Sequence, residues 1–378
     1  MNPTKPHRRR LSGVAVLATL ALAVAACGSD ADTATESSDA PADDVETTQE
    51  PADDAGVTEE AGDTEASGEC ESGPITVGII PKLGDDPYMT TVRDGMQKAA
   101  DELGQGDEII YTSPSEATGA AQIPFVQQLI SSEVDVIAIA GSDLDSARAE
   151  LAEARERGID VIAFDSDVAT DSRTLFINQA EASELGTKML DSMNELLDGE
   201  GQFAILSSTQ TAVNQNAWIA NMEERLAADE FPGLELVDVV YGEEKADLSA
   251  TRAVELVTQY PDLGGIIIPA GISLPAAATA LSDSGDLGDV KLTGLAPASL
   301  ISDFIKTGDV QDIWWNVTDL GYLTMYAAKA VSQCGVDGSA GTMFDGGELG
   351  EFEVGDDGEV ILGPAQIVTP ENVDEFAF

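Results

Sequence analysis

The feature that most constrains this chain is a regular alternation of short apolar runs with helical patterns, and its first unit spans residues 74–104. Residues 75–80 are mostly apolar and rich in β-branched side chains, which is typical of a buried strand. The loop that follows carries four polar side chains, Lys82, Asp85, Asp86 and Tyr88. Apolar residues then recur at helical spacing until Gly104, which ends the helix. Such a strand–loop–helix unit opens a parallel α/β sheet, in which ligands bind at the carboxyl ends of the strands.

The same alternation continues along the rest of the chain. Further strands are expected at Glu108–Tyr111, Asp135–Ala140, Asp160–Phe164, Thr174–Ile177, Gln202–Leu206, Glu235–Tyr241, Gly265–Ile268, Val290–Gly294 and Gln311–Trp315. Helical patterns lie between most of them, and one is expected to have a face made of Ile123, Val126, Gln127 and Ile130. Alternation of this kind predicts parallel sheets joined by right-handed crossovers.

A weak internal repeat indicates two lobes. Residues 121–165 and 251–295 share one order of features: a helix, a strand, a polar loop, an Ala-rich helix and a second strand. Two sheets of about five strands each are more economical than a single sheet of ten. We therefore expect two similar α/β lobes.

The N-terminus has the pattern of an export signal. Basic residues precede Leu11–Ala26, an apolar stretch that is too short for a comfortable membrane span. It ends in small residues followed by Cys27, which resembles a bacterial lipobox and implies cleavage before Cys27 and lipidation of its side chain. The alternative is an ordinary signal peptide, residues 1–26, with an incidental cysteine.

Residues 27–72 are expected to form a disordered acidic tether. Between Gly28 and Ser72 the sequence has no Lys or Arg and almost no large apolar residue, so it cannot bury enough surface to offset its ordering entropy. Its expected role is that of a spacer between the lipid and the folded lobes.

Composition excludes several classes of function. The chain has a net charge of −52, with 70 acidic and 18 basic residues, so it repels the phosphate backbone of nucleic acids. Its only histidine is His7, inside the expected signal peptide. The mature protein would therefore have no Ser-His-Asp or Cys-His apparatus and no histidine metal site.

Two further cysteines, Cys70 and Cys334, lie before the first expected strand and after a late helix. In an exported protein, two leftover cysteines often form a disulfide. The alternative is two free thiols, and the sequence leaves this open.

Polar residues gather directly after the apolar strands. They are Lys82; Asp165, Ser166 and Asp167; Asn178 and Gln179; Asn214, Gln215 and Asn216; and Trp315, Asn316 and Asp319, with Pro269, Ala270 and Gly271 after another strand. Carboxylates and amides can each bond two neighbouring hydroxyls, and a Trp face packs against the C–H side of a sugar ring. Because no nucleophile–base pair occurs among them, this set indicates a binding site for a hydroxyl-rich ligand.

Each of these residues also has a purely structural interpretation. Asp165 could cap the segment that follows it, and Asn214 could be the N-cap of the helix that runs through Trp218. Trp314 and Trp315 point to opposite faces of a regular strand, so one of them is expected in the core. Their shared position at strand ends favours the binding interpretation.

Several short motifs occur in a fixed order: IPKL at Ile80–Leu83, AFDSD at Ala163–Asp167, FINQ at Phe176–Gln179, NQNAW at Asn214–Trp218, YPDLGGIIIP at Tyr260–Pro269 and WN…DLGY at Trp315–Tyr322. Together they resemble the periplasmic sugar-binding family, most closely its rhamnose-binding and autoinducer-2-binding branch. The resemblance covers about Ile75 to Phe378. It implies the type I fold: two Rossmann-like lobes joined by a three-crossing hinge that close around one sugar. The implied ligand contacts are Lys82, Asp165, Asn214, Gln215, Pro269, Gly271, Trp315 and Asn316.

Two positions depart from the autoinducer-2 pattern, which has Asp at the position of Asn214 and Ala at that of Gly271. An amide offers donors as well as an acceptor, so it suits a different set of ligand hydroxyls. The segment Gly84–Met89 also departs, because the autoinducer-2 pattern has aromatic residues at the last two positions. These departures favour a rhamnose-like sugar.

We therefore expect a lipid-anchored, non-enzymatic receptor on the outer face of the cytoplasmic membrane, with residues 73–178 and 294–335 in the N-terminal lobe and 179–293 and 336–378 in the C-terminal lobe. A monomer would deliver a monosaccharide to a membrane permease and its ATPase, without a catalytic residue, metal or cofactor. Three rivals remain: an autoinducer-2 receptor, a sugar sensor that feeds a signalling partner, and a glycosidase that uses Asp165 and Asp167.

Overall fold

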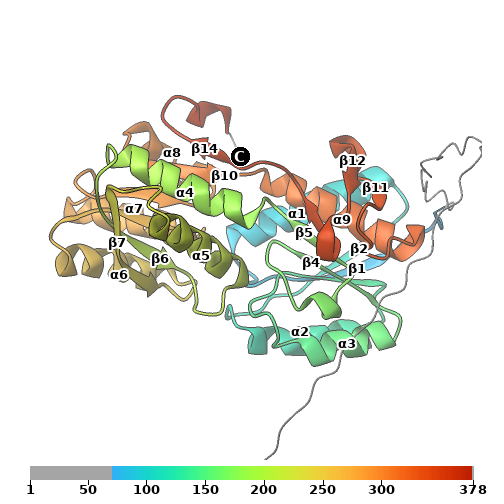
Figure 1. Ribbon diagram of the computed structural model, residues 1–378. Helices are drawn as coiled ribbons and strands as arrows, with labels where there is room; N and C mark the ends of the chain where they lie inside the picture. Colours follow the sequence, from blue (N-terminus) through green and yellow to red (C-terminus); the bar gives the residue numbers. More distant parts are fainter. Residues whose placement is uncertain (1–69, 377–378) are drawn as a thin grey trace, which may run out of the picture. The chain divides into compact units, whose positions relative to one another are not determined.

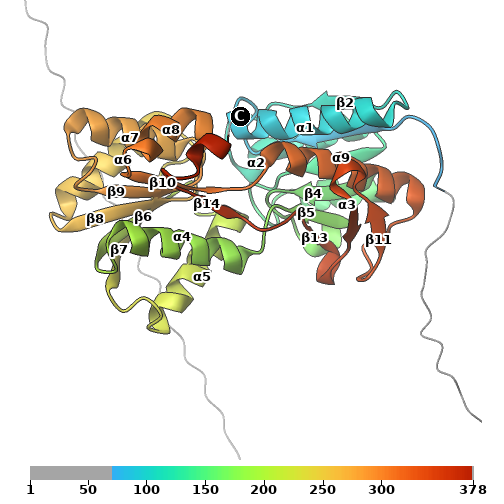
Figure 2. The ribbon, with the colours of Figure 1, turned by 90° about the horizontal axis from the view of Figure 1, so that it is seen from above.

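The computed structural model describes residues 70–376, which fold into two α/β lobes (Figures 1 and 2). The expected signal peptide, the lipidation of Cys27 and most of the expected tether lie outside the described residues. Within the part described, no helix has both the length and the apolar character that a membrane crossing requires.

The N-terminal lobe is built on a sheet in which every neighbouring pair of strands runs parallel. Its order is β13 (Glu359–Ile361), β5 (Leu175–Asn178), β4 (Asp160–Phe164), β3 (Val136–Ile139), β1 (Thr76–Ile80) and β2 (Glu108–Tyr111). Helices α1 (Pro87–Leu103) and α9 (Val317–Cys334) cover one face of this sheet, and α2 (Gly119–Ser131) and α3 (Arg148–Glu156) cover the other (Figure 2).

The C-terminal lobe repeats this plan with an antiparallel strand at one edge. Its sheet has the order β14 (Gln366–Val368), β10 (Val310–Trp314), β9 (Lys291–Gly294), β8 (Leu263–Ile268), β6 (Gly201–Ser207) and β7 (Leu234–Tyr241), and only β14 runs antiparallel to its neighbour. Helices α4 (Ala182–Leu196) and α5 (Val213–Ala227) cover one face, and α6 (Ala246–Gln259), α7 (Ser273–Ser284) and α8 (Ala298–Lys306) cover the other. The two repeated segments form α2–β3–α3–β4 and α6–β8–α7–β9, so the repeat does reflect two lobes.

The chain crosses between the lobes three times, after β5, after β10 and after β13. The expected boundaries are wrong at two places. Strand β10, with helix α8, belongs to the C-terminal lobe because β10 pairs with β9. Strand β13 belongs to the N-terminal lobe because it pairs with β5, and only β14 returns to the other sheet. A three-residue strand such as β13 has too short a pattern to be assigned from the sequence.

Local signals explain why α1 begins and ends where it does. The Asp86 side chain accepts a hydrogen bond from the Tyr88 backbone N–H, Pro87 occupies the first turn, and Gly104 adopts the left-handed conformation that ends the helix. Helix α9 packs so closely on α1 at Gly95 that a Cβ there would lie 2.1 Å from the Thr318 carbonyl oxygen. The strand-end loop before α1 is thereby held on a rigid element.

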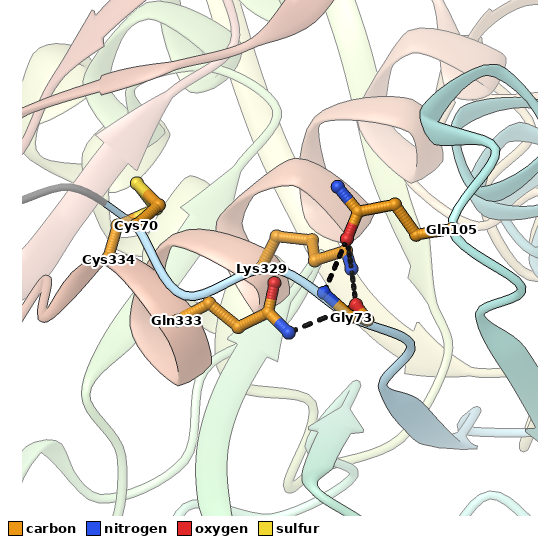
Figure 3. Close-up of a disulfide and its surroundings, with 6 residues drawn as sticks. All are labelled: Cys70, Gly73, Gln105, Lys329, Gln333 and Cys334. Atoms are coloured by element: carbon orange, nitrogen blue, oxygen red, sulfur yellow. Dashed lines mark hydrogen bonds between the residues drawn. A yellow bond between two sulfur atoms is a disulfide. The ribbon is translucent and has the colours of Figure 1, made fainter.

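The start of the described chain is fixed at the end of α9. Cys70 and Cys334 form a disulfide, one of the two alternatives left open above. Lys329 donates to the Gly73 carbonyl oxygen at 2.7 Å, and Gln333 also donates to Gly73 (Figure 3). Lys329 also pairs with the buried Asp107 carboxylate at 2.8 Å. The last residues of the expected tether, 70–72, are therefore part of this junction.

Removing the disulfide should loosen this junction. We expect Cys70→Ser/Cys334→Ser to lower the free energy of unfolding by roughly 2–5 kcal/mol, because the bridge closes a long loop. Denaturant unfolding with and without a reducing agent measures the effect. Equal stability of the variant and the oxidised wild type would contradict it.

Candidate functional site

Loops from the carboxyl ends of both sheets converge on one cavity. From the N-terminal lobe it is lined by Lys82, Asp86, Tyr88, Met89, Thr91 and Asp165, and from the C-terminal lobe by Asn214, Gln215, Trp218, Glu244, Pro269, Gly271, Leu295, Ala296, Pro297, Ile313 and Trp314. Trp315 and Val317, at the second crossing, complete the lining. The cavity lies where parallel sheets are expected to bind ligands.

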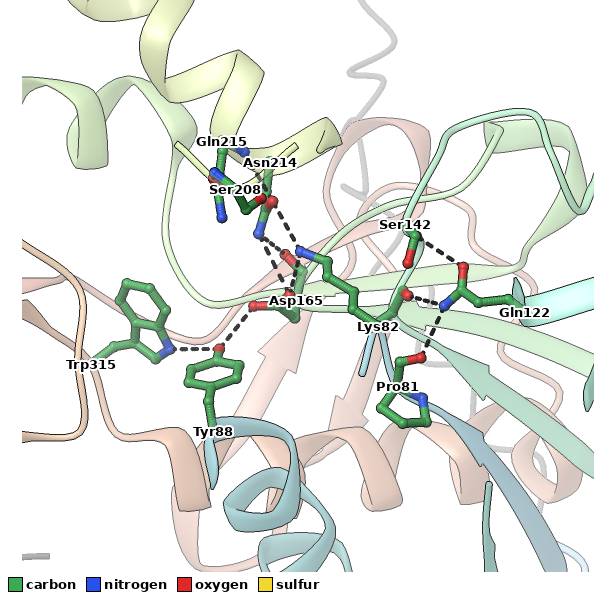
Figure 4. A network of polar contacts seen from close by, with 11 residues as sticks. Pro81, Lys82, Tyr88, Gln122, Ser142, Asp165, Ser208, Asn214, Gln215 and Trp315 are labelled. Atoms are coloured by element: carbon green, nitrogen blue, oxygen red, sulfur yellow. Dashed lines mark hydrogen bonds and ion pairs between the residues drawn. The ribbon is translucent and has the colours of Figure 1, made fainter. Parts of the chain in front are cut away.

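A buried ion pair lines the cavity. Lys82 Nζ is 3.0 Å from Asp165 Oδ2, and both residues are less than a tenth exposed. Lys82 also donates to Asn214 Oδ1 at 3.0 Å, which joins the N-terminal lobe directly to the C-terminal lobe (Figure 4). A buried charge needs such partners, because leaving it unpaired costs several kcal/mol.

A second chain of hydrogen bonds reaches Asp165 from the other side. Trp315 Nε1 donates to Tyr88 Oη at 3.1 Å, and Tyr88 Oη donates to Asp165 Oδ1 at 2.9 Å (Figure 4). Burial and the neighbouring Asp165 charge raise the pKa of Tyr88 well above its usual value, so its hydroxyl keeps its proton and remains a donor. Trp218 lies edge-on to Trp315, with ring centroids 6.4 Å apart.

Two buried glutamines hold the loops in place. Gln122 of α2 donates to the carbonyl oxygens of Pro81 and Ala140 and accepts from the Ser142 N–H, so it connects the loops that follow β1 and β3. Gln215 Oε1 accepts from Ser207 Oγ and the Ser208 N–H, which connects the first turn of α5 to the end of β6. Lys82 follows the anchored Pro81, and Asn214 precedes the anchored Gln215, so both residues keep defined positions.

The structural interpretations of Asp165 and Asn214 do not hold. Asp165 adopts a left-handed backbone conformation (φ 59°) directly after β4, and its side chain points to Lys82 and Tyr88 rather than to a helix end. Asn214 lies inside α5, whose N-cap is Ala212. The left-handed backbone conformation of Asp165 is uncommon for a residue other than glycine and often occurs at functional sites.

All the predicted ligand residues except Asn316 line the cavity. The Asn316 side chain instead caps α9 by accepting from the Asp319 N–H. Trp314 and Trp315 both line the cavity. Trp315 is a buried core residue, as expected for one of the two, and Trp314 is half-buried beside Phe376. The sequence indicates Asp86 and Tyr88 in the first strand-end loop and Trp218 in the helix that begins near Asn214, but it gives little sign of Glu244. It follows β7 by three residues, and its single signal is that position.

The cavity wall carries more negative than positive charge. Burial and repulsion by Glu244 and Asp165 raise the pKa of Asp86 to about 7, against the opposing effects of the Tyr88 N–H and Lys82. Burial also raises the pKa of Glu244, against the attraction of Lys82. Asp86 and Glu244 together therefore readily hold one proton near neutral pH.

The arrangement is suited to binding rather than to a reaction. Asp167, the second carboxylate of the glycosidase hypothesis, does not line the cavity. Its side chain instead accepts two hydrogen bonds from Arg173. Among residues 70–376, no group of His, Cys, Asp and Glu side chains has the arrangement of a metal site. What the cavity offers are amide, carboxylate, ammonium and hydroxyl groups next to aromatic rings, which match polyhydroxylated ligands.

Comparisons with known proteins agree with this class of site. The sequence profile of the family described as "Periplasmic binding protein domain" matches residues 77–335, which is more than half of the chain. The chain belongs to this family of periplasmic binding proteins, as its motifs predicted.

Solved structures with the same fold are solute-binding components of ABC transporters. One, from Clostridium phytofermentas with bound L-rhamnose, is 31% identical, with 81% of this chain and 99% of that chain covered and a TM-score of 0.77. A sugar ABC transporter protein from Actinomyces odontolyticus is 35% identical, with coverages of 80% and 98% and a TM-score of 0.66. LsrB from Clostridium saccharobutylicum, in complex with AI-2, is 21% identical, with coverages of 80% and 100% and a TM-score of 0.75, and shares the fold.

The raised pKa of Asp86 predicts a pH dependence of stability. Between pH about 4 and about 7 the folded protein holds a proton on Asp86 that the unfolded chain releases, so the free energy of unfolding falls as pH rises through this window. Asp86→Asn keeps a good N-cap and should flatten this fall. Melting temperatures of both proteins across that range measure it.

Asp85→Asn, at the exposed neighbouring position, is the matched control and should retain the pH slope of the wild type. Identical slopes for Asp86→Asn and the wild type would contradict the assignment.

Proposed function

We propose that the protein is a lipid-anchored solute-binding protein of an ABC importer, which binds a rhamnose-like monosaccharide between its lobes and delivers it to a membrane permease. The observation that carries the proposal is the Lys82–Asp165–Asn214 cluster, because it places donors and acceptors from both lobes around one cavity. Closure of the lobes would surround the sugar and present the closed form to the permease.

The polar cluster accounts for selectivity among sugars. Lys82 donates only, the Asp165 carboxylate accepts only, and Asn214 does both. A sugar whose hydroxyls match this order replaces the water around each group, and one that lacks a hydroxyl leaves a buried group unpaired, which costs about 1–3 kcal/mol. The rings of Tyr88 and Trp218 lie edge-on to Trp315, with interplanar angles of 82° and 63°, and the face of an aromatic ring in this group can pack against the C–H side of the sugar.

Two observations favour a rhamnose-like sugar over autoinducer-2. The relative with bound L-rhamnose is 31% identical over nearly its whole length, whereas the AI-2 complex shares the fold at 21% identity. The Asn214 amide nitrogen lies 3.3 Å from the Asp165 carbonyl oxygen and 3.5 Å from Oδ2, where an Asp would place a second carboxylate. Autoinducer-2 uptake by the same kind of receptor is the second candidate. A sensor that passes the closed state to a signalling partner is the third.

The location follows from the N-terminal signal. A lipid on Cys27 and a spacer of acidic residues would keep a monomeric receptor at the outer face of the cytoplasmic membrane, close to its permease and ATPase. One acyl chain holds a protein only weakly, so a lipidated cysteine with more than one chain fits the stable attachment that this role needs.

A thermal-shift screen of monosaccharides tests the function. We expect L-rhamnose or a related deoxy sugar to raise the melting temperature by several degrees, since a ligand at 100 times its Kd stabilises by about 2.7 kcal/mol. A response to autoinducer-2 alone would favour the second candidate. No response to any sugar, or turnover of a glycoside, would contradict the proposal.

Variants at Asp165 test the site itself. Asp165→Asn keeps the shape of the side chain but removes the charge opposite Lys82, and we expect it to weaken binding of the stabilising sugar roughly 10- to 100-fold. Asp145→Asn, at an exposed position after β3 that does not line the cavity, is the control and should bind normally. Normal binding by Asp165→Asn would contradict the assignment.

A further inference from the structure

Two carboxyl groups from opposite lobes line the same cavity. Asp86 comes from the loop before α1 in the N-terminal lobe, and Glu244 from the loop between β7 and α6 in the C-terminal lobe. They are close enough for the charge of Glu244 to be the largest electrostatic contribution to the raised pKa of Asp86. In the arrangement described above neither has a cation of its own, because Lys82 lies 3.0 Å from Asp165.

The position of this pair is as informative as its charge. A second, outer cavity adjoins the first and is lined by Leu83, Asp85, Asp86, Pro87, Glu244, Gly271, Ile272, Pro275, Pro297 and Leu300. Asp86, Glu244, Gly271 and Pro297 line both cavities. The two carboxyl groups therefore lie at the boundary between the inner cavity and the outer one, on opposite lobes.

We propose that Asp86 and Glu244 are specificity-determining residues that select ligands by charge, so that the site takes neutral sugars and rejects sugars bearing a carboxylate or phosphate. This inference rests on the proposed function and adds the substrate class. An anionic sugar in the inner cavity would lie next to two carboxyl groups in a partly desolvated space, where repulsion between like charges is only weakly screened. A neutral sugar meets no such repulsion and can bond to either carboxyl group.

The charge balance of the cavity supports this selection. The titratable groups that face the pair are Lys82, Asp85, Tyr88 and Asp165 from the N-terminal lobe, with Glu244 and Asp86 facing each other. Tyr88 remains neutral and Lys82 balances Asp165, which leaves the pair and the exposed Asp85 to set the sign of the field. A ligand anion has one cation to pair with, and Asp165 and Asn214 already contact that cation.

The chain offers matched controls for both residues. Glu243 has the same left-handed backbone conformation as its neighbour Glu244 (φ 53° and 51°), but it is exposed and lines neither cavity. Asp85 precedes Asp86, is exposed, and lines only the outer cavity. The double variant Asp85→Asn/Glu243→Gln therefore removes the two neighbouring carboxyl groups without changing the inner wall.

Calorimetric titration with neutral and anionic sugars tests the inference. The neutral probes are L-rhamnose and D-fucose, and the anionic probes are D-galacturonate and D-glucuronate. We expect the wild type to bind the anionic probes at least about tenfold more weakly than its better neutral probe. In Asp86→Asn/Glu244→Gln, the ratio of the Kd for the anionic probes to the Kd for the better neutral probe should fall about tenfold. In the control double variant this ratio should stay unchanged.

Changing the pH provides a second readout. Uronic acids stay ionised at about pH 5.5, whereas Asp86 is protonated there, so the wild type should bind the anionic probes more tightly at about pH 5.5 than at about pH 8. This dependence should disappear in Asp86→Asn/Glu244→Gln.

Equal affinity of the wild type for neutral and anionic probes would overturn the inference, and so would an unchanged ratio in Asp86→Asn/Glu244→Gln. These results leave the proposed function standing, because neutral sugars still bind. Failure of both neutral probes, and of every other neutral sugar in the screen, is a different result that overturns the proposed function and this inference with it.

Discussion

The site depends on one buried ion pair, Lys82 with Asp165. Removing two charges from water costs several kcal/mol per ion, and their attraction offsets this only when further hydrogen bonds satisfy both groups. Here Tyr88 donates to one oxygen of Asp165, and Lys82 has a second acceptor in Asn214. Since Asn214 belongs to the other lobe, the partner that completes the pair is available only when the two lobes are close together.

The fold explains how such distant residues meet. Lys82 and Asp165 follow two strands of one sheet, and Asn214 lies in the first turn of a helix that follows a strand of the other. The second crossing carries Trp315, whose indole N–H reaches Tyr88, so the hinge itself contacts the binding groups (Figure 4). A rotation of one lobe about the crossings would therefore change the polar cluster and the aromatic wall together, as domain closure around a ligand requires.

Much of the fold was predictable because the central strands are nearly continuous apolar runs, and such runs mark strands buried on both faces. Ile75–Ile80 and Gly265–Ile268 are examples, and the strand-end rule then located Lys82 and Asp165. Helix faces were less certain. Gln127 was assigned to the face of α2 that includes Val126, yet it is exposed, while Gln122 is buried because its amide satisfies backbone groups at two strand ends.

What could not be predicted depends on contacts between distant segments. The pairing of β13 with β5 joins residues that lie far apart along the chain, and Glu244 lies in an acidic loop that looks like ordinary solvated surface. Asn316 does not line the cavity for a local reason, since its side chain accepts a hydrogen bond from the backbone of its own helix. The motif placed it beside Trp315, but the capping interaction decided its direction.

The account is tested most directly by the coupling between Lys82 and Asn214 in sugar binding. Affinities for the sugar that stabilises the protein would be measured for the wild type, Lys82→Met, Asn214→Ala and the double variant. We expect both single changes to weaken binding, with an interaction free energy of roughly 0.5–3 kcal/mol between them, because the two side chains act as one unit across the lobes. Independent effects that simply add in free energy, or single variants that bind as the wild type does, would contradict the account.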